Sequence, residues 1–435
     1  MCSSDLNYLS APPSGASGMM VAYFSMEYGL VDCLHIYSGG LGVLSGDHLK
    51  AASDAQIPLV GIGLLYQRGY LKQAISADGT QEELPTVNDF YSLPLTPESH
   101  ADGSELLIDV EIGDTLVYFK IWRADVGRVR LYLLDSNIPQ NALQEHREIT
   151  NRLYGGDLHN RMRQEIALGI GGLRALEALG VQPTVFHMNE GHSAFLAVER
   201  IRVLMAGQDL TFTEALEASR GNNVFTTHTS VPAGIDIFPE ELLRQYFERY
   251  CEQAGIAFSD FLALGRSVPD ASSGGFSMAV SAFKTSAYRN AVSKLHRTVS
   301  QKMWRDLWPQ MLTEEIPIAS ITNGVHAPTW VARQVLELAH GASIDDAEGW
   351  NVIANAPDEQ LWSIKRALRE ELVAMTRTRL RDSWINRGAS EAELGWVDSV
   401  LDPDILTIGF ARRVPSYKRL TLMLRNPERL KALLT

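Results

Sequence analysis

The stretch TVFHMNEGHSAFLAVERIR, residues 184–202, passes from a short apolar run through a polar turn into a helix-forming stretch. Runs that are rich in valine and phenylalanine favour strands. The same order of strand, loop and helix returns in three further segments, at residues 222–250, 316–330 and 404–424. Strands that alternate with helices predict a doubly wound parallel sheet, whose ligands lie beyond the carboxyl ends of the strands. The sequence therefore predicts an α/β fold with functional residues in the loops that follow these four strands.

Residues near the amino terminus continue this pattern. The run VAYFSM, residues 21–26, predicts a strand, and a glycine-rich loop at 37–46 and a helix from about Asp47 follow it. The run PLVGIGLLY, residues 58–66, is continuously apolar, as is typical of a buried strand.

Residues 104–136 alternate apolar and polar side chains and carry turn signals at Gly113-Asp114 and Val126-Gly127. This alternation predicts antiparallel strands. Residues 161–180 place isoleucine and leucine at helical spacing and end at Gly180, so they predict a helix.

The chain is expected to fall into four segments. Residues 1–20 have the composition of a flexible leader, and 21–330 form the Rossmann-like lobe. Residues 331–403 form a helical linker region that contains a long helical pattern at 358–388. A strand and a helix at 404–435 cannot bury their apolar faces alone, so we interpret them as the start of a truncated second lobe.

Composition limits the classes of function. The 435 residues are 45% hydrophobic and 21% charged, which suits a folded chain with a large core. No apolar run has the length of a membrane span, and no secretion signal is evident. Three scattered cysteines predict a reducing compartment, the cytoplasm. The net charge of −13 argues against nucleic acid or an anionic membrane as the main partner.

The glycine-rich loop at 37–46 matches neither of two common nucleotide motifs. A nucleoside-triphosphate loop needs a Lys-Ser or Lys-Thr pair, which is missing. A dinucleotide fingerprint counted from Gly40 and Gly42 needs glycine at position 45, where Ser45 stands, and Gly46 comes one residue late. Two interpretations stay open, an anion site at a helix amino terminus and a tight turn with close packing.

A second candidate is the basic run ARRVPSYKR at residues 411–419. It concentrates four cations just after a predicted strand: Arg412, Arg413, Lys418 and Arg419. Arginine offers a planar fork that suits phosphate, and lysine adds a point charge. The alternative is the solvated basic start of a helix.

Polar residues at the other predicted strand ends complete the candidate set. They are Asn189, Glu190, His192, His228, Thr229, Asn323 and His326. The motif HMNEGH lacks the two histidines four residues apart of zinc proteases, so a metal site is not expected. Hydrogen bonding to a polyhydroxyl ligand suits these side chains, although a structural role remains the alternative for each histidine.

Taken together, these motifs resemble α-glucan phosphorylases of the bacterial type. The motifs YFSMEYGL, YSGGLGVLSGDHLKAASD, LYGGD, NEGH, TTHT, TNGVHAPTW and ARRVPSYKR occur in the family's order and at roughly its spacing, from about residue 21 onward. The resemblance implies an α/β fold of GT-B type, with a Rossmann-like N-terminal lobe and only the start of the second lobe present.

The resemblance also implies a reaction and its partners. The reaction is phosphorolysis of terminal α-1,4-linked glucose from glycogen or maltodextrin to glucose 1-phosphate, with retention of configuration. Its cofactor is pyridoxal phosphate, which acts through its 5′-phosphate. The implied partners are the α-1,4-glucan and inorganic phosphate or glucose 1-phosphate, and a homo-oligomer of the full-length protein is compatible with it.

The resemblance assigns roles residue by residue. Four residues match the glycine loop whose amides face phosphate and sugar, and two of them, Gly39 and Gly40, would also contact the cofactor: Gly39, Gly40, Leu41 and Gly42. Five residues match the gating loop, the acceptor region and the glucosyl site: Asp157, Glu190, His192, His228 and Asn323.

The remaining assignments concern the phosphate groups. Arg413 matches the arginine that binds the substrate phosphate, and Lys418 matches the lysine beside the cofactor phosphate. Trp330 matches a tryptophan near the cofactor, and Arg412 a further basic residue. Arg413, Lys418 and His228 are thus the implied catalytic residues.

The sequence departs from the family at two places. Pro415 stands where animal-type relatives carry histidine. No segment resembles the GTSGMK-like stretch that holds the cofactor's Schiff-base lysine, so we expect a fragment with little or no turnover of its own.

Two alternatives stay open. A glycogen or starch synthase that uses a nucleotide sugar would need a lysine shortly before the glycine loop, where Tyr37 and Ser38 stand. A non-catalytic glucan-binding module is the other.

Overall fold

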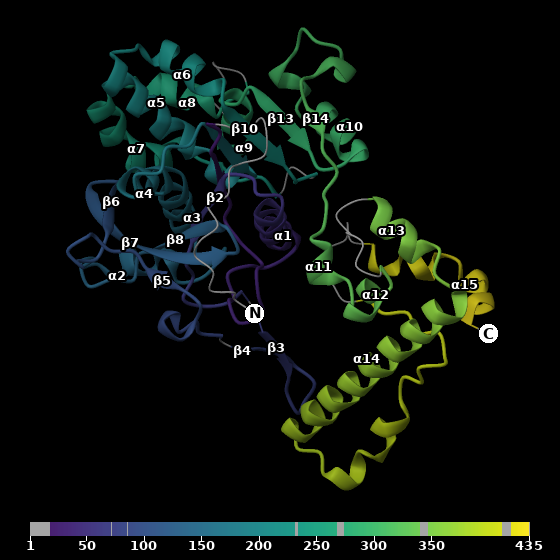
Figure 1. Cartoon of the computed structure of the whole chain (residues 1–435). Helices are drawn as coiled ribbons and strands as arrows, with labels where there is room; N and C mark the ends of the chain where they lie inside the picture. Colours follow the sequence, from purple (N-terminus) through teal and green to yellow (C-terminus); the bar gives the residue numbers. More distant parts are fainter. Residues whose placement is uncertain are drawn as a thin grey trace. The chain divides into compact units, whose positions relative to one another are not determined.

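The chain divides into two compact units (Figure 1). Unit 1 comprises Met1–Lys72 and Pro85–His326, and unit 2 comprises Gln73–Leu84 and Ala327–Thr435. The computed structural model describes residues 18–70, 72–84, 86–230, 234–267, 274–339, 347–410 and 419–434.

A mixed sheet forms the centre of unit 1. Its strands follow the order β14, β13, β10, β9, β1, β2, β8, β7, β5, and β6 also pairs with β7. From β14 to β8 all neighbouring strands are parallel, whereas β7 pairs antiparallel with β5, β6 and β8. The strands are β1 Val21–Phe24, β2 Leu59–Leu64, β5 Thr96–Pro97, β6 Leu107–Ile112, β7 Thr115–Val126, β8 Val129–Asp135, β9 Val185–Asn189, β10 Asn223–Thr227, β13 Tyr288–Ala291 and β14 Ala319–Ser320.

These strands confirm the predicted α/β fold and most of its parts. All six residues of β2 are buried, as the apolar run predicts. The antiparallel strands β6, β7 and β8 lie together in Figure 1, with turns that begin at Gly113 and Gly127. Both glycines have a positive φ, 63° and 61°. The predicted strand at 316–322 shrinks to the two-residue β14, and β13 is a strand that the sequence patterns missed.

The strand order reverses beside β1. The chain moves from β1 to β2 on one side and later returns to β9 on the other. Such a reversal is a topological switch point, and α/β sheets bind ligands beyond the carboxyl ends of the strands that flank it. The loops after β1 and β9 are therefore the first place to look for a site.

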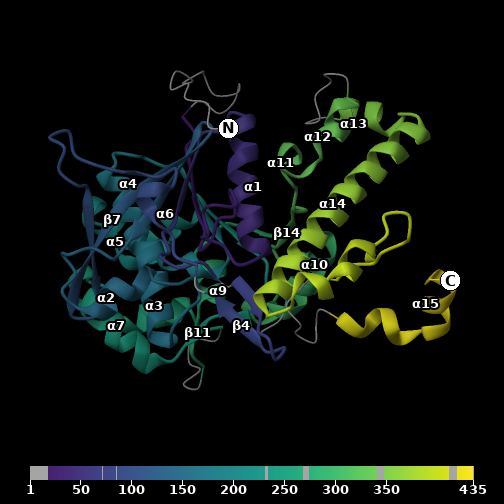
Figure 2. The ribbon, with the colours of Figure 1, turned by 90° about the horizontal axis from the view of Figure 1, so that it is seen from below.

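The glycine-rich stretch is a helix rather than a loop. Helix α1 spans Gly40–Asp54, so the predicted start near Asp47 is wrong by about two turns (Figure 2). The glycines serve close packing, because a Cβ on Gly46 would lie 2.0 Å from the backbone oxygen of Gly29. A Cβ on Gly42 would lie 2.5 Å from Cβ of Tyr37. The many glycines let this helix pack closely against neighbouring segments. Helix propensity alone would instead predict a turn here.

The remaining helices of unit 1 cover the sheet and its loops. The helix predicted at 161–180 is confirmed as a continuous run, α3 Leu158–Ile166, a π-helical segment Ala167–Gly171 and α4 Gly172–Ala178, and Gly180 follows with φ +67°. The other helices are α2 Gln144–Arg147, α5 Phe195–Gln208, α6 Phe212–Arg220, α7 Glu240–Ala254, α8 Phe258–Leu264, α9 Met278–Lys284 and α10 Lys294–Met303. Short 3₁₀ turns lie at Phe90–Ser92, Glu148–Thr150, Gly191–Ser193, Arg305–Leu307 and Thr313–Glu315.

Two further sheets have two strands each. Strand β11 Ile237–Phe238 pairs with β12 Phe276–Ser277. Strand β3 Lys72–Ile75 pairs with β4 Gln81–Leu84.

Unit 2 is mostly helical. It contains α11 Ala327–Trp330, α12 Arg333–Glu337, α13 Ala347–Ala354, α14 Asp358–Asn386 and α15 Pro427–Leu434, with 3₁₀ turns at Glu391–Glu393, Gly395–Ser399 and Leu420–Arg425. The long helix α14 confirms the pattern at 358–388. A small core of Leu338, Ala339 and Ile353 lies in this unit. In the part of the chain that the structure describes, no helix is both long and apolar enough to cross a membrane.

The strand predicted at 404–410 is wrong. These residues form no strand, and Ile405, Leu406 and Phe410 are exposed. A strand needs a paired neighbour for its backbone groups, and within the described residues none lies beside this segment. Its apolar content alone therefore does not produce a strand.

Candidate functional site

Polar side chains from three neighbouring strands meet beside the switch point. Strand β9 lies between β1 and β10, all three parallel, so their carboxyl ends share one edge of the sheet. Asn189 ends β9, and His228 directly follows β10. Of the four strand ends that the sequence predicts to converge, hydrogen bonds join two here, those of β9 and β10.

Asn189 is the central connector of this edge. Its Nδ2 donates to Ser25 Oγ at 3.2 Å and to Ser45 Oγ at 3.1 Å, which ties β9 to the loop after β1 and to helix α1. Its Oδ1 lies 2.6 Å from His228 Nε2. Because Oδ1 can only accept, Nε2 of His228 carries the proton and donates.

His228 is therefore held as one tautomer. Burial lowers its pKa, and the neighbouring His296 lowers it further, while Glu190 acts in the opposite direction. The neutral ring keeps its Nδ1 as an acceptor, and no described residue forms a hydrogen bond with that atom. The arrangement presents a fixed hydrogen-bond acceptor to a ligand hydroxyl.

Glu190 links the end of β9 to the end of β10 through hydrogen bonds. Its Oε2 accepts hydrogen bonds from the backbone N–H of His228 at 2.8 Å and of Thr229 at 2.9 Å, and also from the Thr229 hydroxyl. Its backbone has φ +71°, an unusual value for a residue other than glycine. Strained backbone of this kind clusters at functional sites and costs about 1–3 kcal/mol.

His192 lies in the short turn after Glu190 and is buried. Burial lowers its pKa to about 4, and the positive charge of Arg161 adds to the effect. Its Nε2 is 3.5 Å from Asp236 Oδ2, and its Nδ1 is buried without a hydrogen-bond partner among the described residues. An unsatisfied buried nitrogen beside a switch point marks a place for a ligand group.

Arg161 and Asp236 extend this cluster and were missed by the sequence patterns. Arg161 Nη2 lies 2.7 Å from Asp236 Oδ2, and its Nε lies 3.2 Å from Oε1 of the fully buried Glu165. Burial would raise the pKa of Asp236, but the charges of Arg161 and His192 outweigh it and lower the pKa. Burial, with help from Asp236, raises the pKa of Glu165 well above its usual range.

The amino end of helix α1 carries a carboxylate of the chain itself. Glu27 Oε2 accepts from Ser38 N at 2.6 Å and from Gly39 N at 3.2 Å. A Cβ on Gly42 would lie 2.8 Å from the same oxygen. The other oxygen, Oε1, accepts from the Tyr154 hydroxyl at 2.8 Å. Glu27 and Tyr154 both lie in motifs that the sequence analysis quotes. Because the two residues are 127 positions apart, no local sequence pattern predicts their contact.

Further amides of α1 remain available. Among the described residues, none accepts a hydrogen bond from the N–H groups of Gly40, Leu41 and Gly42, which belong to the first turn of the helix. Such orphan amides, together with the helix dipole, form an anion-binding position. The anion interpretation of the glycine-rich stretch thus has a geometric basis, although the local structure is a helix.

Asp157 caps helix α3 in the segment after Tyr154. Its Oδ1 accepts from Asn160 N at 2.9 Å, and this hydrogen bond lowers the pKa of the exposed carboxyl. This capping hydrogen bond marks the point where the segment at 154–157 ends and α3 begins. The predicted gating role stays a prediction.

The other predicted residues are placed in different ways. Asn323 follows β14, and its backbone N–H donates to Val292 O. His326 Nε2 lies 2.8 Å from Asp54 Oδ2. Trp330 belongs to unit 2 and is 56% exposed. Three predicted phosphate-binding residues, Arg412, Arg413 and Lys418, lie outside the described residues, as do Pro415 and most of the leader.

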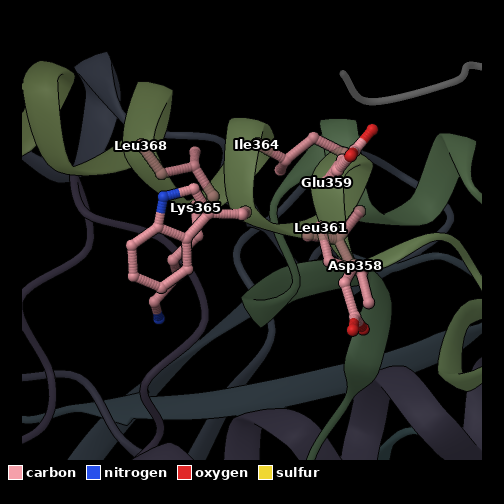
Figure 3. Close-up of a pocket in the computed structure, with 8 residues that line it drawn as sticks. Asp358, Glu359, Leu361, Ile364, Lys365 and Leu368 are labelled. Atoms are coloured by element: carbon pink, nitrogen blue, oxygen red, sulfur yellow. The ribbon is translucent and has the colours of Figure 1, made fainter.

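Unit 2 contains an apolar groove of about 700 Å³ (Figure 3). It is lined by one residue of α12, Val335, and by a face of α14 that includes Leu361, Ile364 and Leu368. No predicted site residue lines it. Within the described ranges, no group of three or more His, Cys, Asp or Glu side chains is placed to hold a metal ion.

Polar strand ends and partly unbonded helix amides lie at the switch point of this sheet, the position where α/β proteins that bind ligands hold them. The family model for carbohydrate phosphorylase matches residues 174–371. The chain is 48% identical to a glycogen phosphorylase of Mycobacterium tuberculosis over 432 residues, which cover 95% of the chain and 49% of that relative. The chain is thus similar to carbohydrate phosphorylases along nearly its whole length.

Two further relatives agree. A maltodextrin phosphorylase of Thermococcus litoralis is 42% identical over 94% of the chain and 49% of its own length. A glycogen phosphorylase of Aquifex aeolicus is 38% identical over 94% of the chain and 60% of its own length. The chain therefore spans about half the length of most of the curated relatives that it matches.

Proposed function

We propose that this chain is part of an α-1,4-glucan phosphorylase of GT-B architecture, which releases terminal glucose from glycogen or maltodextrin as glucose 1-phosphate. The observation that carries the proposal is that Asn189 hydrogen-bonds both Ser45 of α1 and His228, so the unbonded α1 amides and the His228 acceptor belong to one switch point. A phosphate and a sugar hydroxyl are the two groups that such a pair suits.

In this proposal the first turn of α1 binds an anionic phosphate group. The amides of Gly40, Leu41 and Gly42 donate to its oxygens, and the helix dipole adds to the attraction. Glu27 already occupies the neighbouring amides of Ser38 and Gly39. The carboxylate thereby confines the phosphate to the amides that remain.

His228 binds the glucosyl unit. Its protonated Nε2 is committed to Asn189, so Nδ1 accepts from a sugar hydroxyl, which we assign to the 6-hydroxyl. Asn323 takes part in the same subsite, and Glu190 orients His228 through its backbone N–H. Glu190 and His192 are proposed to lie toward the glucan acceptor.

The cofactor proposed for the intact enzyme is pyridoxal phosphate. The free amides of α1 suit a phosphate group, and Trp330, Arg412 and Lys418 are the further residues that would hold it. When bound, this cofactor supplies a phosphate that exchanges a proton with the substrate phosphate. Arg413 binds the substrate phosphate, and Lys418 neutralises charge beside it.

The proposed partners are the α-1,4-glucan, inorganic phosphate and, in the full-length protein, further copies of itself. We place the protein in the cytoplasm, which the thiols of Cys33 and Cys251 suit because neither is in a disulfide.

The test compares the full-length protein with the 435 residues. Each is incubated with maltodextrin and phosphate, and glucose 1-phosphate is measured with a coupled enzyme assay. We expect product from the full-length protein and little or none from the 435 residues, which have no GTSGMK-like segment. Robust turnover by the 435 residues would contradict the second expectation, and incorporation of glucose from a nucleotide sugar would favour a synthase.

A further inference from the structure

Unit 1 contains a cavity lined by cationic side chains. Its volume is about 400 Å³, and helices α6, α8 and α9, strand β13 and the turn at Arg305–Leu307 contribute to its wall. None of the predicted site residues lines it. Six residues carry its chemistry: Arg220, Asp260, Phe283, Lys284, Arg289 and Trp308.

Two of the three cations are fixed in place by backbone carbonyls. Lys284 Nζ donates to Ala263 O at 2.7 Å and to Arg266 O at 2.6 Å. Arg289 Nε donates to Phe283 O at 2.8 Å, and its guanidinium lies 5.3 Å from the centre of the Trp308 ring. Arg289 is only 9% exposed. Carbonyl contacts orient these groups without neutralising them.

Three cationic side chains line the cavity against one carboxylate, that of Asp260. In the described part of the chain, neither Lys284 nor Arg289 forms an ion pair with a carboxylate, whereas Arg220 pairs with Glu217 at 2.5 Å on the helix surface. Burial lowers the pKa of Lys284, and burial together with the charge of Arg220 lowers the pKa of Arg289 to about 10. Like charges in a partly desolvated cavity are unfavourable, and a bound anion removes this cost.

We propose that this cavity binds the phosphate group of a small phosphate monoester, at a site separate from the glycine-rich helix α1. The guanidinium groups of Arg220 and Arg289 supply the planar donors that suit phosphate oxygens, and Lys284 supplies a third cation. The indole of Trp308 and the ring of Phe212 provide an apolar wall for the organic part of the ligand. A volume of about 400 Å³ accommodates a molecule of that size.

The experiment uses the 435-residue chain, inorganic phosphate as the probe and the melting temperature as the readout. Wild type is expected to gain about 2 °C or more at saturating phosphate. Arg220→Gln removes a cation from the cavity, and its surface pair with Glu217 contributes little. We expect this variant to melt at the wild-type temperature or above it without phosphate, and to lose at least half of the phosphate-dependent gain.

Two further variants make the result specific. Arg244→Gln removes a similar surface arginine on α7, outside the cavity, and is expected to keep the full gain. Arg289→Lys keeps the positive charge but loses the planar guanidinium, and this variant is expected to keep part of the phosphate-dependent gain in melting temperature. A phosphate-dependent gain in Arg220→Gln equal to that of wild type, or no gain in wild type, would overturn the proposal. Phosphorolysis of the glucan is measured separately, on the full-length protein.

Discussion

At the scale of single residues, the side chain of Glu27 holds several polar contacts of the candidate site. Its carboxylate joins the amides at the start of α1 to the Tyr154 hydroxyl, so one side chain connects two elements of the candidate site. A hydrogen bond to a charged group contributes roughly 1.5–3 kcal/mol. Removing that charge should therefore shift the amino end of the helix.

We predict that Glu27→Gln in the full-length enzyme lowers kcat/KM for phosphate by about tenfold or more. The amide group keeps the size of the side chain but replaces one acceptor with a donor that faces backbone N–H groups. Steady-state kinetics with varied phosphate measure the effect. Glu248→Gln, in an exposed pair with Arg244, is the control, and equal kinetics for both variants would contradict the prediction.

The buried histidines predict a loss of stability in mild acid. Burial lowers the pKa of His187 to about 3 and that of His192 to about 4, both well below the value near 6.5 expected in the unfolded chain. Between these values the unfolded state binds more protons, so stability is present above about pH 6.5 and falls as the pH falls.

Each of these histidines should contribute about 1 kcal/mol of lost unfolding free energy per pH unit between pH 6 and pH 5. Urea unfolding of the 435-residue chain at a series of pH values measures this slope. His187→Gln should make the slope shallower by about one histidine's share, whatever its effect at pH 7. A slope that is unchanged in this variant would show that His187 is protonated in the folded state.

At the scale of elements, the glycines of α1 show what sequence patterns cannot supply. Position 46 of α1 is glycine because the backbone of Gly29 passes 2.0 Å from where a Cβ would be. That contact is made by a segment before the helix, so no local rule of propensity reveals it. The strand missed at β13 and the false strand at 404–410 have the same origin, since pairing partners decide strands.

We predict that Gly46→Ala destabilises the chain by about 2 kcal/mol or more, because the clash is with backbone and cannot be relieved by a rotamer change. Gly207→Ala is the matched control in helix α5, where a Cβ meets nothing within 4 Å. It should be neutral or stabilise by up to about 1 kcal/mol. Denaturant unfolding measures both, and equal stabilities would refute the packing explanation.

The candidate site was predictable in part. Asn189 ends β9, Glu190 and His228 directly follow strands, and neighbouring parallel strands bring these ends together. Arg161 and Asp236 are 75 positions apart and have no such pattern, so only the folded chain shows their pairing.

At the scale of the whole molecule, the residues of the candidate site that the structure brings together belong to unit 1. Unit 1 holds the switch point, the free amides of α1 and the polar strand ends, while the predicted cations at 411–419 lie almost entirely outside the described residues. The chain spans about half the length of most of the phosphorylases that it matches. Turnover is therefore a property to measure on the full-length protein.

The most direct measurement is phosphorus NMR of the full-length protein incubated with maltodextrin and inorganic phosphate. If the protein is a glucan phosphorylase, we expect the phosphate signal to decline and that of α-glucose 1-phosphate to grow. Both changes should require the glucan. His228→Asn should slow the exchange by about tenfold or more, because Nδ1 no longer receives the sugar hydroxyl. A folded, pyridoxal-phosphate-loaded protein that forms no glucose 1-phosphate would contradict the assignment.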